Sequence, residues 1–259
     1  MSSPALAAVS PSGDDASAGR RPRSAAALAA IGLAALVIFG GFVSLGVWQL
    51  ERRVWKLDLI ERVDARIHAA PVAAPGPAEW PETSADRDAY RRVIAAGAFI
   101  PGKTALTQAV TEQGAGFWVL APLKTTQGFT VLVNRGFVPA DKRGEAEAMT
   151  PAGPVAVTGL LRVSEPGGGF LRANDPGAER WTSRDVAAIA AARGLEGVAP
   201  YFIDADATQN PGGLPVGGLT VVSFRNSHLV YALTWFALAA MVAGGAAILF
   251  AHERALRRR

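Results

Sequence analysis

The residue in this chain with the clearest chemical potential is a histidine at the start of the second of two long apolar segments. His228 is followed by Tyr231 and Trp235, and at helical spacing the three side chains fall on one face. Neutral imidazole binds metals, and an ionisable residue within a membrane helix marks a candidate functional site. The same residue types also form aromatic belts at the membrane interface. The residues alone therefore leave a ligand site and an aromatic belt as two interpretations.

Of the metals considered, iron in a porphyrin best suits the possible ligands in this chain. One histidine at the edge of an apolar wall is sufficient as an axial ligand, and Tyr231 and Trp235 could line a flat apolar molecule beside it. Arg225 lies just before the segment and could pair with a propionate. Copper relay through soft ligands is excluded, because the chain has no Cys and only 3 Met. These residues make His228 the candidate ligand of a haem iron.

Two helices long enough to cross a bilayer must position these residues. No Asp, Glu, Lys or Arg occurs in residues 24–50 or in residues 227–251. At about 1.5 Å per residue, each run covers roughly 30 Å of hydrocarbon. The first run is too long for a cleaved signal peptide, whose apolar region is usually about 7 to 15 residues, so we predict an uncleaved anchor. Asn226 or Ser227 is expected to cap the second helix.

The distribution of basic residues orients the two spans. Basic residues are balanced on the two sides of the first span, whereas four arginines follow the second span and Arg225 alone lies close before it. The positive-inside rule then places both termini in the cytoplasm and exports residues 51–226. That segment has 19 basic and 19 acidic residues, so the net charge of +4 comes from the tails. The high pI therefore reflects topology and predicts no nucleic-acid partner.

The segment between the spans is predicted to be a mainly-β (α+β) domain, an antiparallel barrel or sandwich. Helical periodicity continues from the first span to about Ala69, and four prolines between Pro71 and Pro81 indicate a linker. One helix is expected from Arg184 to about Arg193, capped by Thr182 or Ser183. The predicted strands cover residues 89–99, 103–109, 117–123, 129–138, 155–163, 201–203 and 219–224.

The predicted organisation places this domain between two transmembrane α-helices. In chain order it comprises a disordered cytoplasmic tail (1–23), a transmembrane helix (24–50), a helical extension (51–70), a linker (71–88), the exported domain (89–218), a final strand leading to the membrane (219–226), a transmembrane helix (227–251) and a basic cytoplasmic tail (252–259). Close approach of the two spans is expected at small residues spaced by four, namely Gly40 with Ser44, Ala239 with Ala243, and Ala240 with Gly244.

No enzymatic activity is predicted. The exported segment has one histidine, His68, which lies near the end of a charged helix and is expected to be solvated. No spacing typical of a nucleophile elbow or a catalytic triad occurs. Neither glycine-rich loop, 167–169 or 211–218, precedes a helix that could make a phosphate cradle. The absence of cysteine excludes disulfides in a compartment that would permit them.

Three motifs lie at the ends of the spans and in the central domain. They comprise Leu45, Gly46, Trp48, Gln49, Arg52 and Lys56; the run Asn134, Arg135, Gly136, Phe137, Val138 and Pro139; and Asn226, His228, Tyr231 and Trp235. In this order, and on a two-span plan, they resemble the motifs of the Surfeit-locus family of cytochrome c oxidase assembly factors. The similarity runs from about Phe42 to Phe250. Phe137 departs from the family pattern, which commonly has Trp there, but both residues are large aromatics that can pack.

The resemblance implies a bacterial inner-membrane factor with a periplasmic central domain that helps to insert haem a into subunit I of a haem-copper oxidase. It implies that His228 binds haem a transiently, with subunit I as partner and haem a synthase as a further partner. Arg135 could meet a haem propionate or the partner, although the residues themselves favour a strand end with a turn glycine at Gly136. A haem-free scaffold for subunit I is the alternative. Whether the client oxidase uses cytochrome c or quinol stays open.

Overall fold

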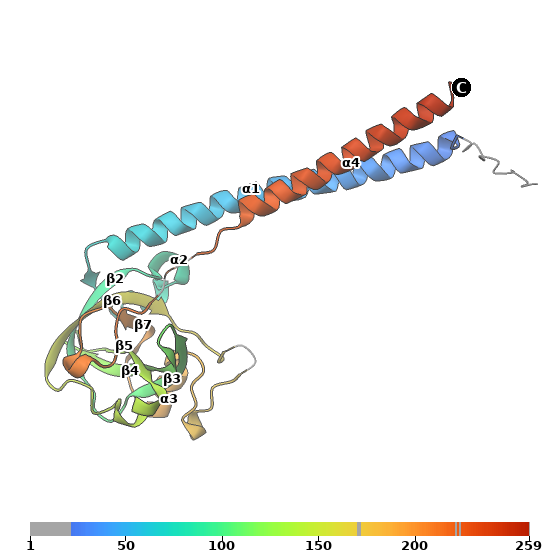
Figure 1. Cartoon of the computed structure of the whole chain (residues 1–259). Coiled ribbons are helices and arrows are strands. Elements are labelled where there is room, and N and C mark those ends of the chain that lie inside the picture. The colour runs from blue at the N-terminus through green and yellow to red at the C-terminus, as the bar shows by residue number, and fades with distance from the viewer. Residues whose placement is uncertain (1–21, 170–171, 221, 223, 259) are drawn as a thin grey trace, which may run out of the picture. The chain divides into compact units, whose positions relative to one another are not determined.

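The computed structural model describes residues 22–169, 172–220, 222 and 224–258. The cytoplasmic tail predicted for residues 1–23 therefore lies almost wholly outside the described residues. The chain divides into two units, Met1–Trp55 with Asn226–Arg259, and Lys56–Arg225. The first unit contains two apolar helices and the second a β-rich domain (Figure 1). The predicted fold class, two apolar helices flanking a mainly-β domain, is confirmed.

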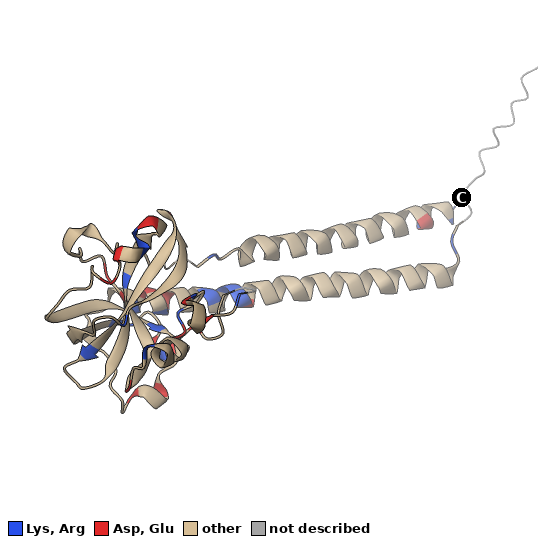
Figure 2. Ribbon diagram, turned by 90° about the horizontal axis from the view of Figure 1, so that it is seen from below, with Lys and Arg blue, Asp and Glu red and all other residues tan. Residues whose placement is uncertain are grey.

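The apolar helices are α1 (Ala25–His68) and α4 (His228–Leu256), and both are long and apolar enough to cross a membrane. They run side by side and antiparallel (Figure 1), and the charged residues lie toward their ends (Figure 2). Arg23 forms an ion pair of 3.1 Å with Glu253. Further along, Phe42 stacks on Trp235 with ring centroids 5.6 Å apart. The pair is thus held by an ionic contact at one end and by apolar packing along its length.

Two glycines of α1 lie directly against aromatic rings of α4. A Cβ added to Gly46 would lie 2.5 Å from Cε1 of Phe236, and one added to Gly32 would lie 3.2 Å from Cζ of Phe250. Added Cβ atoms on Gly40 and Gly244 would meet nothing within 4 Å. The predicted close approach at these two glycines is therefore wrong, because the large residues of the partner helix select which small residues are contacted.

The β-rich domain is a closed, barrel-like sheet. Its order is β1-β2-β6-β7-β5-β4-β3, and an additional pairing of β2 with β4 closes the ring. Of the two predicted architectures the barrel is therefore the one observed. The strands are β1 (Val72–Ala73), β2 (Arg92–Phe99), β3 (Ala105–Thr111), β4 (Gly114–Thr125), β5 (Thr130–Pro139), β6 (Pro154–Val163) and β7 (Val198–Ala205).

Most strand pairs are antiparallel, as predicted, but β5 and β7 pair in parallel. Parallel neighbours need a long crossover, and the chain makes it through β6 and helix α3 (Val186–Arg193). The remaining short helices are α2 (Ala85–Asp88), η1 (Trp80–Glu82), η2 (Ala140–Glu145), η3 (Pro176–Ala178) and η4 (Pro211–Gly213).

Alternation along the strands separates two apolar clusters. Each of the five strands that form the ring contributes to the first cluster, which must therefore fill the barrel; it includes Val93, Leu123, Val131, Leu161 and Ile203. The second cluster packs α3 and Trp181 against the outer face of the sheet and includes Leu120, Leu132, Ile189 and Phe202. Neighbouring residues of one strand thus serve different clusters, as the period of two requires.

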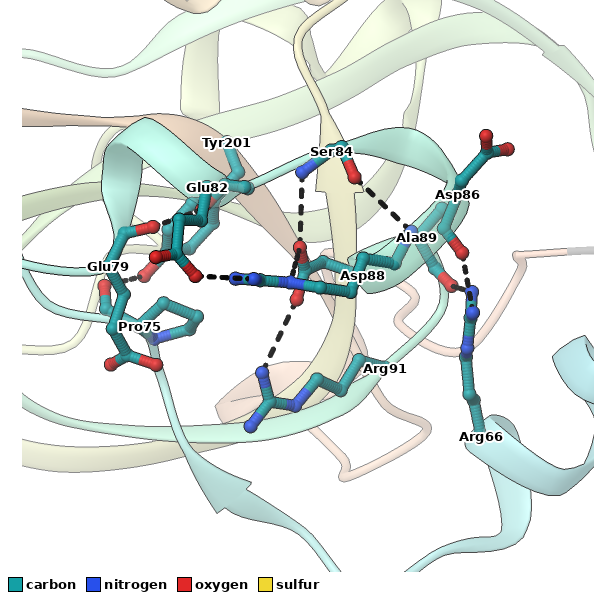
Figure 3. A network of polar contacts seen from close by, with 12 residues as sticks. Arg66, Pro75, Glu79, Glu82, Ser84, Asp86, Asp88, Ala89, Arg91 and Tyr201 are labelled. Carbon is teal, nitrogen blue, oxygen red and sulfur yellow. Dashed lines mark hydrogen bonds and ion pairs between the residues drawn. The ribbon is translucent and has the colours of Figure 1, made fainter.

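The segment predicted as a linker, residues 71–88, is structured. It contains β1, which pairs in parallel with β2, as well as η1 and α2. The carbonyl oxygen of Pro75 accepts hydrogen bonds from Trp80 Nε1 at 3.0 Å and from the Tyr201 hydroxyl at 2.7 Å (Figure 3). Ala74 lies in the barrel core. The prolines do end α1, but tertiary burial then orders a segment that has no periodicity of its own.

Asp88 organises the end of the same segment. Its carboxylate is buried, accepts from the Ser84 backbone N–H at 3.1 Å and pairs with Arg87 and Arg91 (Figure 3). Arg66, in the last turn of α1, donates to the carbonyl oxygen of Ala89 at 3.2 Å. The part of α1 that belongs to the β-rich unit is therefore tied to it by side-chain hydrogen bonds.

Two further sequence predictions need correction. Residues 219, 220, 222 and 224–226 form no strand, and residues 221 and 223 lie outside the described residues. Since β5, β6 and β7 are each paired on both sides, they leave no edge for another strand. Helix α3 is capped by Asp185, which accepts from Ala188 N at 3.1 Å. The predicted cap Ser183 instead donates its hydroxyl to the Glu165 carbonyl oxygen at 2.7 Å.

Candidate functional site

His228 is the first residue of α4, and its ring contacts the other apolar helix. Nδ1 of His228 lies 2.7 Å from Oε1 of Gln49 on α1. A carbonyl oxygen only accepts hydrogen bonds, so Nδ1 is the donor in this contact, and in the neutral ring Nε2 is then the nitrogen with the lone pair. Metal-bound histidines commonly donate their other N–H in this way, which fixes the tautomer and the ring orientation. The hydrogen bond thus leaves Nε2 ready to act as a ligand.

Gln49 belongs to the first sequence motif, but sequence reasoning assigned it no role. The two hydrogen-bonded residues are 179 positions apart, and neither helical periodicity nor composition pairs them. The available signal was weak: a Gln near the end of a helix and a His at the start of the next become neighbours when two antiparallel spans pack together.

The three side chains that begin α4 lie at helical spacing on one face but have different surroundings. Trp235 is half-buried and stacks on Phe42, so one face of its indole is used in helix packing. Tyr231 is 54% exposed. Ser227 occupies the N-cap position, as one of the two predicted caps, but makes no side-chain cap hydrogen bond. Asn226 Oδ1 is buried and has no hydrogen-bond partner among the described residues.

The donor set around His228 suits a porphyrin better than a bare metal ion. Among the described residues, no three His, Cys, Asp or Glu side chains come together as a metal site. A haem brings four ring nitrogens of its own and asks the protein for one or two axial ligands. A single imidazole with a free Nε2 meets that requirement. Arg225, the predicted propionate partner, is exposed in the segment that precedes α4, and its role stays a prediction.

Arg135 lies in the β-rich unit and does not present its charge at the surface. The residue is 3% exposed, and its guanidinium donates to Thr150 Oγ1 at 3.3 Å and to Asn210 Oδ1 at 2.8 Å. Burial lowers the pKa of Arg135 to about 10, and the charge of Glu147 opposes this only in part. Arg135 is therefore buried inside the β-rich unit, and its contact with a haem propionate or with a partner stays a prediction.

Gly136 is not the turn glycine that the residues suggested. It lies within β5, with φ of +130°, and a Cβ there would collide with the carbonyl oxygen of Val216. The following residue, Phe137, forms an isolated bridge with Val216. Glycine is needed here because the left-handed backbone and the close approach of the second chain segment both exclude a side chain.

A buried ion network on the outer face of the barrel was not predicted by any sequence pattern. Asp204 is 2% exposed and accepts from Asn134 Nδ2 at 2.8 Å, from Arg162 at 2.9 Å and from Arg184 at 3.2 Å. Asn134 also accepts from the Gly136 backbone N–H at 3.2 Å. The first residue of the central motif therefore joins the motif to this network, and its role is structural.

Comparison with known proteins assigns the chain to a family. The family model described as SURF1 family matches residues 36–240. Human Surfeit locus protein 1 is 35% identical over 223 residues, which cover 76% of this chain and 69% of the human protein. The Xenopus tropicalis Surfeit locus protein 1 is 34% identical over 220 residues, covering 76% and 68% of the two chains.

A more distant relative supports the same assignment. The SURF1-like protein of Monosiga brevicollis is 32% identical over 225 residues, which cover 80% of each chain. The matched region includes all three sequence motifs, the closed barrel and the histidine at the start of α4. The chain therefore belongs to the SURF1 family.

Proposed function

We propose that this chain is a membrane-anchored assembly factor for a haem-copper terminal oxidase, which binds haem a through His228 and assists its insertion into subunit I. Membership of the SURF1 family supports the assembly role. The observation that carries the haem proposal is the 2.7 Å contact between His228 Nδ1 and Gln49 Oε1, because it uses Nδ1, holds the ring in one direction and leaves Nε2 as the nitrogen that can face a ligand.

In this proposal each residue has a separate task. Haem a is the cargo, and its iron is the redox centre that the finished oxidase uses. His228 provides the one directional bond, and Gln49 orients the ring. Tyr231, half-exposed at the same end of α4, offers contact area, and Arg225 pairs with a propionate. Binding of haem through one protein ligand suits its transfer, since only a single coordinate bond must break before subunit I receives the haem.

The proposed location is the bacterial inner membrane, with both termini in the cytoplasm and the β-rich domain in the periplasm. The four arginines after residue 253 support this orientation by the positive-inside rule. A reporter that is active only outside the cytoplasm, inserted in the glycine loop 167–169, should be active. A second reporter, one that functions only in the cytoplasm, should be inactive at the same position. Its activity there would contradict the orientation.

A haem-free scaffold that holds subunit I during assembly is the second candidate. The same hydrogen bond favours it, since a His–Gln contact between two membrane helices also acts as a polar clamp that fixes their packing. In this case His228 would be needed for the helix pair and not for haem. Haem a synthase would be a further partner in the first proposal only.

The absorption spectrum of the full chain, purified in detergent from cells that make haem a, separates the two candidates. We expect a Soret band that survives purification and is lost in His228→Ala, while Tyr231→Phe and Trp235→Phe only reduce the haem content. His252→Ala is the matched control, because His252 lies on the same helix and is exposed. Full haem content in His228→Ala would remove this residue from the mechanism. Colourless protein that still captures subunit I would favour the scaffold.

A further inference from the structure

The side chains of β5 that point into the barrel form a row, and the last residue of this row is the charged Arg135. Phe129, which directly precedes this strand, and the alternate strand residues Val131 and Val133 belong to the apolar cluster that fills the barrel. Arg135 follows at the next position of the same row, and its guanidinium lies 5.4 Å from the Phe99 ring centroid. Since side chains of a strand alternate between faces, Arg135 belongs to the interior row and marks the end of the apolar core.

This guanidinium has polar contacts but no counter-charge. Its two hydrogen bonds go to Thr150 and Asn210, which are both neutral. Among the residues that the structure describes, no Asp or Glu carboxylate lies within 4.0 Å of it. Glu147, whose charge acts on it from further away, accepts instead from the backbone N–H groups of Gly102 and Thr104. A guanidinium has five N–H donors, so three remain for another partner.

Arg135 lines a cavity of about 310 Å³ whose walls are mainly apolar. The walls include Phe99, Val133, Val155, Val157 and Ala205, which come from β2, β5, β6 and β7. The loop residues Asp206, Thr208, Gln209 and Asn210 form a polar rim, in which the Asp206 carboxylate accepts from the Thr208 backbone N–H at 3.0 Å. Mouths of small barrels are common sites for small molecules, and a few polar groups among apolar walls fix the orientation of the ligand.

We propose that the cavity at this end of the barrel binds a small monocarboxylate with a short apolar tail. The carboxylate pairs with the free donors of Arg135, and the tail lies along Val133, Val155 and Val157. A lone buried cation is costly, and an anion that enters the cavity removes that cost. A neutral or cationic ligand would leave the charge uncompensated, and an anion without a tail would leave the apolar walls empty. The proposal goes beyond the haem function and does not depend on it.

The test is isothermal titration of the full chain in phosphatidylcholine nanodiscs with hexanoate, hexanol, acetate and inorganic phosphate. Hexanoate should bind saturably with one site per chain, and the other three ligands should bind more weakly by about tenfold or more. Arg135→Gln should weaken hexanoate by about tenfold or more. Arg143→Gln, an exposed arginine that also lies over a phenylalanine ring, is the matched control and should leave binding unchanged.

A second variant separates the cavity from the charge. Ala205→Leu adds side-chain volume to the cavity while keeping Arg135, and it should also weaken hexanoate. Near-ultraviolet circular dichroism checks folding, and the comparison of hexanoate with hexanol on the unmodified chain decides the question if a variant fails to fold. No saturable hexanoate binding, equal binding of hexanol, or unchanged binding in Arg135→Gln would each overturn the proposal. Phosphate binding more tightly than hexanoate would overturn the assignment to a monocarboxylate.

Discussion

Arginines that are buried or half-buried occur in two regions of the barrel, and their surroundings differ in one respect. On the outer face, Arg162 and Arg184 surround the carboxylate of Asp204, and Arg184 also pairs with Glu165 at 2.6 Å. In the interior row, Arg135 is buried more completely and has only the neutral side chains of Thr150 and Asn210. The outer-face charges are satisfied by the fold, whereas the interior charge is not.

The pKa values follow this difference. Burial lowers the pKa of Arg184, but its hydrogen bond with Glu165 and the charges of Asp204 and Glu165 outweigh burial, so the pKa is raised overall. Burial also lowers the pKa of Arg135, and with no adjacent carboxylate it falls to about 10. A buried charge with partners is expected of a structural element, whereas one without partners persists only where something other than stability retains it.

The largest loss of stability is expected when Asp204, the carboxylate shared by the outer-face arginines, is removed. Asp204→Ala leaves two guanidinium groups facing each other without the carboxylate, and removing one partner from a buried ionic group costs about 3 to 5 kcal/mol. Chemical denaturation of the full chain in nanodiscs, followed by tryptophan fluorescence, measures the loss. Asp206→Ala, a change to the next acidic residue on the chain, should cost much less. A loss below about 1 kcal/mol for Asp204→Ala would show that the network does not stabilise the barrel.

An intermediate effect is expected at the link between the network and the central motif. Asn134→Ala removes one hydrogen bond to Asp204 and one from the Gly136 backbone N–H, both of which are buried. Leaving such groups unsatisfied costs about 1 to 3 kcal/mol. The same denaturation series measures the change, and the double variant Asn134→Ala/Asp204→Ala should cost less than the sum of the two. Additive losses would place Asn134 outside the network.

Replacing the interior arginine, Arg135, is expected to increase the free energy of unfolding, whereas the two preceding substitutions lower it. Arg135→Met removes the uncompensated charge and keeps an apolar side chain of similar length, so the free energy of unfolding should rise by about 1 to 2 kcal/mol without ligand. Thr150 and Asn210 are only partly buried and can bond to water instead. The midpoint of denaturation measures the gain. A loss of about 2 kcal/mol or more would make Arg135 a structural anchor and remove the contrast with Arg184.

The smallest change in stability is expected for a partly exposed ion pair. Arg193 and Glu179 are 2.5 Å apart, and the side chain of Glu179 is half-exposed. The hydrogen bond from Arg193 holds the pKa of Glu179 below its usual value, so the stabilisation is present above the usual pKa of a glutamate and is lost as the pH falls through the lowered pKa. Glu179→Gln should cost under about 1 kcal/mol at neutral pH. The difference from the unmodified chain should vanish in acid, and a difference that persists there would show a contribution unrelated to charge.

The sequence by itself determined the properties that depend on local pattern. Two uncharged runs predicted α1 and α4, and the alternating runs 89–99, 129–138 and 155–163 predicted β2, β5 and β6 to within a few residues. The three motifs identified the family before any contact was known. Each of these inferences rests on spacing, since a period of two or of 3.6 decides which residues share a face.

Only the tertiary structure decided which faces meet. Closure of the ring between β2 and β4 distinguishes the barrel from a sandwich, and the parallel pairing of β5 with β7 follows from a crossover that no local pattern encodes. The same closure directs Arg135 into the interior and gives Asp204 its partners. Packing of α4 on α1 joins His228 to Gln49 across 179 positions. Long-range partners depend on chain topology and burial, and these are set by the fold as a whole.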